Sequence, residues 1–416
     1  MATAYDKSGK KGRQLLIPEN FTPETAGPTL FATTSAKVTA KSAAPRALLA
    51  TTKDNFEQRL TELKAQLQTA LELEHSTIPP YLCALYSIRP GTNLMPVEII
   101  KSVVLEEMLH MIMVANLLNA IGGQPQIGAK ETGKGGKFVP DYPTRLPGDI
   151  DPTLVISLEC FSKASIKTFW KIEHPSGGYK LPPDFGPEAT AYGSIGEFYE
   201  ALLKNITELE TIAKAKGKTI FTGKSERQVS ADQYYGAGGK LFTVQNLEDA
   251  CKVIEEIVGQ GEGTLGSIFS TPFQEGDPKY LIFGPDVEEY AHYFRFKEVF
   301  YERFYAINDS AHRDSHNKGL PTGEKFDVDW GAVCNMKPNP KLKDYKKGTP
   351  IYNKMYEFNK SYSALLNNIN EACNGRPEVL KEGIPLMYQL KYQAIELMNI
   401  PVGDGYMAGP SFEYVQ

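Results

Sequence analysis

Three of the six histidines in this chain follow a glutamate by three residues. The pairs are Glu72 with His75, Glu107 with His110, and Glu289 with His292. On an α-helix, residues three positions apart lie on the same face, so each pair can direct a carboxylate and an imidazole at one point. Two such pairs, with one glutamate from each of two further helices, make the ligand set of a dinuclear carboxylate-bridged metal site in a four-helix bundle. The repeated spacing therefore predicts a redox metalloprotein built on helices.

The charge and cysteine content limit the partners and the compartment that we expect. A net charge of -5 gives no basic surface of the kind that nucleic acids or anionic membranes attract. The sequence has no apolar run long enough to span a bilayer, so we expect neither nucleic acid nor membrane as a partner. The five cysteines are odd in number and form no Cys-x-x-Cys motif. They argue against a disulfide framework or a zinc ribbon and fit a reducing, cytoplasmic location.

The chain divides into three regions by composition and pattern. Residues 1–50 are rich in Ala, Thr, Ser and Lys and show no periodicity, so we interpret them as a mobile N-terminal arm. Their acidic residues argue against a transit peptide. A metal-binding bundle is expected at 51–310, and a C-terminal loop with a helical hairpin at 311–416. Apolar spacing places the two helices of that hairpin at 351–373 and 377–399.

Helical spacing of apolar residues predicts two long helices, at about 55–88 and about 96–120. Glu74 lies on the apolar stripe of the first helix, where a carboxylate is costly unless a cation meets it. Glu72 lies on the more polar side. In an antiparallel pair, the depths of Glu74 and Glu107 along their helices bring the two carboxylates level. We therefore expect Glu74, rather than Glu72, to act beside the second Glu-x-x-His pair.

Residues 124–245 are rich in Gly, Pro and Lys and separate the two expected pairs of bundle helices. We interpret them as a long, part-β crossover insertion that caps the bundle. Within this region, Thr153–Phe161 is predicted as a strand and 194–212 as an amphipathic helix. Short strand-like pieces are expected at 215–245.

The second pair of bundle helices is predicted at about 246–269 and about 285–305. Glu262 lies on the apolar face of the first of these helices, beside glycines that would let other groups approach the backbone. Glu289 and His292 share a face of the second. The depths of Glu262 and Glu289 agree, so these residues are expected to complete the site.

Each ligand assignment has a simpler alternative. A Glu-x-x-His pair can be a buried histidine paired with a neighbouring acid, without a metal. The presence of several carboxylates on apolar faces favours metal binding, because buried carboxylates without cations are energetically poor. His75 and Glu255 fit outer or exposed positions better, and Glu72, the partner of His75, is on a polar side. His312 and His316 lie in a polar loop and are expected to be solvated.

Four segments carry a resemblance to a known family. They are Leu73–Leu82, Glu106–Met111, Gln260–Gly263 and Glu289–Phe296. These segments resemble the ferritin-like domain of the iminophenyl-pyruvate dimer synthases, which act in bisindole pathways such as violacein and rebeccamycin biosynthesis. The resemblance covers most of 55–310 and implies a mainly α fold, a ferritin-like four-helix bundle with a non-haem metal site. The bisindole enzymes are much longer chains, so the resemblance implies the metal site rather than the dimerising reaction.

The predicted metal ligands are Glu74, Glu107, His110, Glu262, Glu289 and His292. Carboxylates and imidazoles together suit two iron ions, with manganese as the alternative, and argue against a structural zinc. The leading hypothesis is an enzyme, a non-haem dinuclear iron oxidase or oxygenase that uses O2. Its substrate would be a small molecule, with an amino-acid-derived compound of secondary metabolism as the candidate.

Two other interpretations stay open at this stage. The first is a ferritin-like iron-handling protein without an organic substrate; the large insertion and the added hairpin favour an enzyme with a cavity over this alternative. The second is a purely structural helical protein, which would leave four carboxylates buried without cations. A homo-oligomer is also left open.

Overall fold

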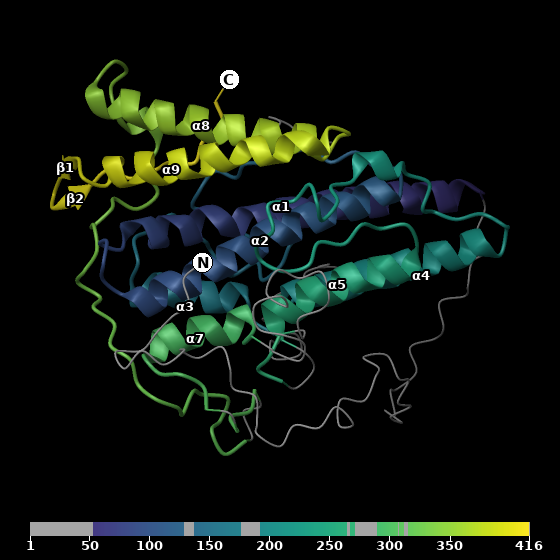
Figure 1. Ribbon diagram of the computed structural model, residues 1–416, viewed down its shortest axis with the longest axis horizontal. Coiled ribbons are helices and arrows are strands. Elements are labelled where there is room, and N and C mark those ends of the chain that lie inside the picture. The colour runs from purple at the N-terminus through teal and green to yellow at the C-terminus, as the bar shows by residue number, and fades with distance from the viewer. Residues whose placement is uncertain are drawn as a thin grey trace.

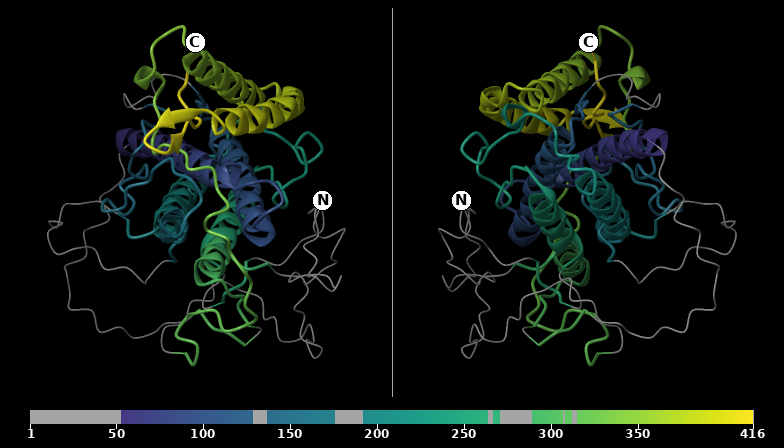
Figure 2. Two further views of the ribbon diagram at one scale, coloured as in Figure 1. Left: turned by 90° about the vertical axis from the view of Figure 1, so that its left-hand side faces the viewer. Right: turned by 90° about the vertical axis from the view of Figure 1, so that its right-hand side faces the viewer.

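The structure is a computed structural model that describes residues 53–128, 137–175, 192–263, 267–270, 289–306, 308–311 and 315–415. The expected N-terminal arm lies outside the described residues. The helices are arranged in layers around a central pair, α1 (Lys53–Ser87) and α2 (Leu94–Ala120) (Figures 1 and 2). One side of this pair is covered by α3 (Lys163–Ile172), α4 (Ile195–Lys214), α5 (Leu247–Glu262) and α7 (His292–Tyr301). The other side is covered by α8 (Pro350–Ala372) and α9 (Gly383–Leu397).

The central pair confirms the first two predicted helices to within two residues at each end. Helix α1 continues through Pro79 and Pro80, which lie inside its span. Helix α2 begins after Asn93, a residue in the left-handed region with φ 49°. Most of α2 is buried, because it has neighbours on several sides. This burial explains why its polar residues need partners inside the fold.

Four shorter helices complete the bundle on one side of the central pair. Helix α1 contacts α3 and α4, while α2 contacts α5 and α7. The short helices also pack in pairs, α3 on α7 and α4 on α5 (Figure 1). Helices α3 and α4 come from the region that the sequence predicts as a capping insertion. They pack on α1 and so form part of the bundle wall.

In the second helix pair, the predicted start of the first helix at about 246 is confirmed, whereas its predicted end and the predicted bounds of the second helix are wrong. Helix α5 stops at Glu262 because Gly263 adopts φ 92°, where a Cβ would lie 2.9 Å from a backbone oxygen of Ser267. Helix α7 starts only at His292. Before it, the N–H of Ser270 donates to the carbonyl of Glu289 (2.7 Å), and the N–H of Ala291 donates to that of Ile268 (3.1 Å). These bonds hold 289–291 extended, outside a helix.

The strand prediction for Thr153–Phe161 is also wrong. Ile156 of that segment forms an isolated bridge with Thr144, and the described residues continue it into no ladder. No strand forms in the described part of 215–245 either. There the side-chain amide of Asn116 donates to the carbonyls of Val229 (2.8 Å) and Phe242 (3.0 Å). A side chain of α2 therefore satisfies backbone groups that a strand partner would otherwise meet.

The C-terminal hairpin of α8 and α9 confirms the sequence prediction, although α9 starts six residues later than predicted, and α9 contacts α1. Short 3₁₀ helices lie at Ser225–Arg227, Leu342–Asp344 and Pro377–Glu382. Strands β1 (Pro401–Gly403) and β2 (Tyr406–Met407) form an antiparallel pair after α9. None of the described helices combines the length and the apolar character that crossing a membrane requires.

Candidate metal centre

Two groups of buried side chains gather between the central helices and the shorter ones. The first group is Glu74, Glu107 and His110, and the second is Glu107, Glu173 and His292. Within each group, one ligand atom from every residue lies within 4.8 Å of the others. None of these residues is more than 4% exposed. Because Glu107 belongs to both groups, the arrangement is two adjoining sites that share a carboxylate.

Both imidazoles turn the same nitrogen towards the carboxylates. In the first group, Nδ1 of His110 lies 3.5 Å from Oε2 of Glu74 and 4.0 Å from Oε1 of Glu107. In the second, Nδ1 of His292 lies 2.9 Å from Oε1 of Glu107 and 3.5 Å from Oε2 of Glu173. Ligand atoms about 2 Å from one ion lie roughly 3–4 Å apart. The separations therefore match a shared coordination shell.

The opposite nitrogen of each imidazole is held by an outer acceptor. Nε2 of His110 lies 2.8 Å from Oε1 of Gln260. The orientation of that amide is fixed, because its nitrogen donates to Glu256 (2.7 Å). Nε2 of His292 lies 2.6 Å from Oε2 of Glu106. Since both acceptors are oxygens, each Nε2 carries the proton in the neutral ring, and Nδ1 keeps the lone pair that a metal would take.

The carboxylates receive hydrogen bonds that orient them. The phenol of Tyr81 donates to Oε1 of Glu173 (2.5 Å), and the phenol of Tyr199 donates to Oε1 of Glu74. Burial and the adjacent carboxylates raise the pKa of both phenols, so both stay protonated and act as donors. The hydroxyl of Thr77 donates to Oε2 of Glu107 (3.0 Å).

The two ligand groups together hold three carboxylates, and only their two imidazoles can carry a positive charge. Burial and the nearby charge of Glu173 together raise the pKa of Glu107 to about 7. Burial alone would lower the pKa of His292, but the adjacent carboxylates of Glu106, Glu107 and Glu173 outweigh this effect and raise it. Nδ1 of His292 also makes no hydrogen bond of good geometry to any described residue. A buried, oxygen-rich site with an unsatisfied imidazole nitrogen fits divalent cations.

Arg295 keeps Glu106 outside the ligand groups. Its guanidinium pairs with the Glu106 carboxylate and donates to the hydroxyl of Ser102 (2.8 Å). Glu106 is therefore engaged by a cation on one side and by the imidazole of His292 on the other. This pairing positions the histidine, because an imidazole that donates to a carboxylate is fixed in ring orientation and tautomer.

Comparison with known proteins agrees with this geometry. The ferritin-like family model matches residues 67–301, more than half of the chain. This chain belongs to the ferritin-like family. The match confirms the family that the sequence resemblance indicated, together with the mainly α, ferritin-like fold.

Two more distant similarities complete the comparison. Dichlorochromopyrrolate synthase from Lentzea aerocolonigenes is 24% identical over 340 residues, which cover 74% of this chain and 29% of that protein. This chain thus spans less than a third of that relative's length. The crystal structure of a ferritin-like protein from Caulobacter vibrioides has a TM-score of 0.53 and 22% identity. It covers 86% of this chain and 98% of its own, and this likeness shows the fold.

Four of the six predicted ligands of this ferritin-like chain lie together, namely Glu74, Glu107, His110 and His292. The other two, Glu262 and Glu289, belong to neither group. Oε1 of Glu262 accepts a hydrogen bond from the N–H of Gly196 (2.6 Å) at the start of α4. Glu289 precedes α7, so it does not share a helix face with His292 as the sequence spacing predicted.

His75 and His316 occupy different surroundings from the metal centre. Nε2 of His75 lies 2.6 Å from the hydroxyl of Tyr362 in the C-terminal hairpin, on the opposite side of the central layer. The side chain of His316 is largely exposed, with Asp309 at 3.7 Å, and His312 lies outside the described residues. These placements agree with the interpretation of His75 and His316 as residues outside the ligand set.

Sequence reasoning missed Glu173. This residue follows α3 directly and is the C-cap of that helix. A signal was present, because Ile166, Phe169 and Glu173 follow helical spacing and all three are buried. A carboxylate at the end of an apolar stripe is the feature that favoured Glu74. The same test applied to the supposed insertion would have found Glu173.

Proposed function

We propose that this chain is an O2-dependent oxidoreductase that holds two metal ions and acts on a small organic molecule. Iron is the metal that we favour, with manganese as the alternative, because both accept carboxylate and imidazole ligands. The observation that carries the proposal is the pair of buried ligand groups sharing Glu107. One ion would be held by Glu74, Glu107 and His110, and the other by Glu107, Glu173 and His292.

The proposed ligand set differs from the sequence prediction in two ways. It omits Glu262 and Glu289, and it adds Glu173. Glu173 is within ligand distance of His292, whereas Glu262 is bonded to Gly196. The proposal therefore rests on five residues, with Glu107 as the bridging carboxylate.

Iron in such a site supplies the ability to bind and reduce O2. The chain's own residues prepare the site for that chemistry. Gln260 and Glu106 hold the protons on the two Nε2 atoms, so that both Nδ1 lone pairs face the shared carboxylate. Tyr81 and Tyr199 fix the outer oxygens of Glu173 and Glu74. The near-complete burial of these groups keeps water away from them, which protects reactive species from side reactions.

The organic substrate is supported by a distant relative. Dichlorochromopyrrolate synthase is, by its name, a biosynthetic enzyme, and it aligns with 74% of this chain. We infer a biosynthetic role on a small molecule, with an amino-acid-derived compound as the first class to test. The identity of the substrate and the type of oxidation are parts of the proposal that rest on this similarity.

The test is metal loading followed by O2 consumption. The full chain, purified without a tag and reconstituted with Fe(II) under anaerobic conditions, is expected to bind two ions, one for each ligand group. Oxygen uptake should then increase when amino-acid-derived candidates are added. A preparation that holds one zinc and no iron would contradict the metal site. Slow, substrate-independent oxidation that deposits a ferric mineral would favour an iron-handling protein over an oxidase.

A further inference from the structure

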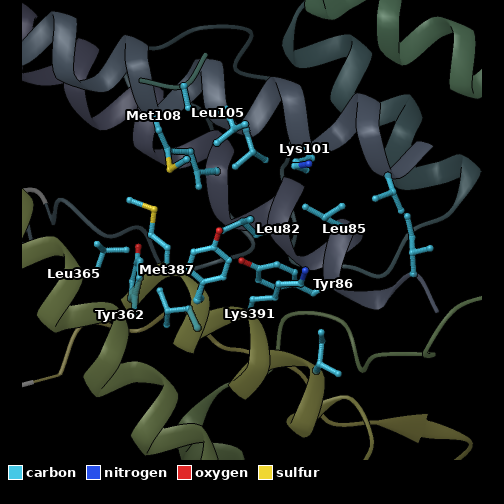
Figure 3. A pocket seen from close by; sticks show the side chains of 18 of the residues that line it. Leu82, Leu85, Tyr86, Lys101, Leu105, Met108, Tyr362, Leu365, Met387 and Lys391 are labelled. Carbon is cyan, nitrogen blue, oxygen red and sulfur yellow. The ribbon is translucent and has the colours of Figure 1, made fainter. Parts of the chain in front are cut away.

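A cavity lies on the side of the central layer away from the metal centre, between the α1–α2 pair and the C-terminal hairpin (Figure 3). Its volume is about 540 Å³, within the range of small-molecule sites. The cavity and the metal centre lie on different faces of α1 and α2, as residues that are neighbours in the sequence show. Glu74 and Glu107 belong to the ligand groups, whereas His75 and Met108, the next residues along α1 and α2, line the cavity. Because consecutive helical residues point about 100° apart, the same two helices can carry two distinct sites.

The wall of the cavity is mostly apolar and aromatic. Leu82 and Leu85 of α1 and Met108 of α2 face Met387 of α9 across it (Figure 3). Tyrosine rings, among them Tyr86, also line the space. Thioethers and aromatic rings make favourable contacts with flat aromatic bodies. This lining suits an aromatic ligand better than a strongly hydrated one.

The charged residues of the wall are all cationic. Arg89, Lys101 and Lys391 line the cavity, and no carboxylate is among the described lining residues. Lys101 has one acidic neighbour, Glu98 at 3.4 Å on the exposed side of α2, and such exposed pairs are weak. The chain as a whole carries more acidic than basic residues, with a net charge of -5. The charged side chains that line this apolar cavity are thus all positive, although the chain as a whole is negatively charged. This arrangement fits the binding of an anion.

His75 contributes a buried ring to the wall. It is 2% exposed, and its Nε2 is engaged by the hydroxyl of Tyr362. Its Nδ1 is enclosed by protein and presents almost no surface to the cavity. The cavity thus offers cations and an apolar, aromatic body.

We propose that this cavity binds a small aromatic carboxylate. Lys101 and Lys391, which approach the cavity from α2 and α9, hold the carboxylate (Figure 3). The rings and thioethers hold the aromatic body. The site is separate from the metal centre, and the proposal does not depend on the oxidase activity.

The test is calorimetric titration of the full chain with 2-naphthoate, its neutral isostere 2-naphthamide and the alkyl acid decanoate. The wild-type protein should bind 2-naphthoate at one site, and bind 2-naphthamide about tenfold more weakly, since a charge-assisted contact is worth on the order of a tenfold change in affinity. Equal affinity for the acid and the amide would overturn the proposal. Tighter binding of decanoate than of 2-naphthoate would overturn it as well, because it would assign the cavity to alkyl chains. This comparison needs no variant and therefore no assumption about folding.

Variants then locate the site. Lys101→Gln and Lys391→Gln should each weaken 2-naphthoate about three- to tenfold and leave 2-naphthamide nearly unchanged. Lys347→Gln is the matched control, because Lys347 is exposed and lies outside the cavity. Leu85→Trp should fill the space and abolish binding of both compounds. Lysine variants that bind 2-naphthoate like the wild type would show that the anion is held elsewhere and would overturn the proposal.

Discussion

The two ligand groups of the metal centre carry similar donors but arise from different parts of the fold. Glu74 and His110 stand in the middle of the long helices α1 and α2. Glu173 follows the end of the ten-residue helix α3, and His292 opens the ten-residue helix α7. Helix phase within long helices fixes the first group, whereas the packing of two short helices against each other fixes the second. In a site of this kind, one ligand group can follow from local helical periodicity while the other follows from tertiary packing.

The outer partners of the two histidines differ as well. His110 donates to the neutral amide of Gln260, while His292 donates to the carboxylate of Glu106, which Arg295 also engages. A carboxylate acceptor makes an imidazole a more basic ligand than an amide does. We therefore expect the His292 group to depend more strongly on its outer partner than the His110 group does.

The largest effect is expected from the shared carboxylate. Glu107→Gln should lose both ions, because Glu107 belongs to both groups and an amide is a poor bridge. Metal content by mass spectrometry after gel filtration measures this change. Glu72→Gln is the control and should keep both ions. A Glu107→Gln protein that still holds both would refute the shared role of this residue.

The number of ions that a variant loses distinguishes Glu173 from Glu262, which the sequence predicted as a ligand. Glu173→Gln should retain the ion of the Glu74–His110 group and lose the other, since only the second group contains Glu173. Glu262→Gln should retain both, because its carboxylate is bonded to Gly196. The same metal analysis distinguishes the two. Loss of an ion in Glu262→Gln with none in Glu173→Gln would restore the sequence prediction.

Outer partners should change affinity rather than stoichiometry. Glu106→Gln is expected to weaken binding of the ion beside His292 by about 10- to 100-fold, as removal of such a partner typically does. Gln260→Leu should weaken binding of the ion beside His110 by a smaller factor, because a neutral acceptor is lost. Competition with a chelator of known affinity measures both constants. Equal losses in the two variants would remove the asymmetry between the groups.

The smallest effect concerns the stability of the metal-free protein. Folding raises the pKa of Glu107 from 4.5 to about 7 through burial and the charge of Glu173. A carboxyl group with a raised pKa contributes stability that is complete below its unfolded pKa and is lost as the pH rises through its folded pKa. Wild type and Glu107→Gln should thus have similar free energies of unfolding near pH 4.5. Near pH 8 the wild type should be less stable, by at most about 3 kcal/mol. Urea unfolding of both proteins between pH 4.5 and pH 8 measures this difference in stability. A difference that does not change with pH would contradict a buried Glu107 with a raised pKa.

The sequence could predict the features that depend on local patterns. The spans of α1, α2, α8 and α9 follow from apolar spacing over many turns. The choice of Glu74 rests on helical phase, and the structure places that residue beside Glu107 and His110. The start of α7 depends instead on the pairing of 268–270 with 289–291, which is a tertiary contact.

The remainder of the site could not be read from spacing alone. Glu289 and His292 have the right separation, but the helix starts too late to place them on one face. Glu106 and Gln260 act as outer partners only because α2, α5 and α7 meet in space. Glu173 was missed because its region was treated as an insertion outside the bundle. Its apolar stripe was nevertheless visible in the sequence.

The most direct test of the central claim is a crystal structure of the iron-loaded protein with anomalous data collected at the iron edge. We predict two anomalous peaks that share Glu107, one beside Glu74 and Nδ1 of His110, and one beside Glu173 and Nδ1 of His292. A single peak, or two peaks whose ligands include Glu262 or Glu289 in place of Glu173, would contradict the two-group arrangement.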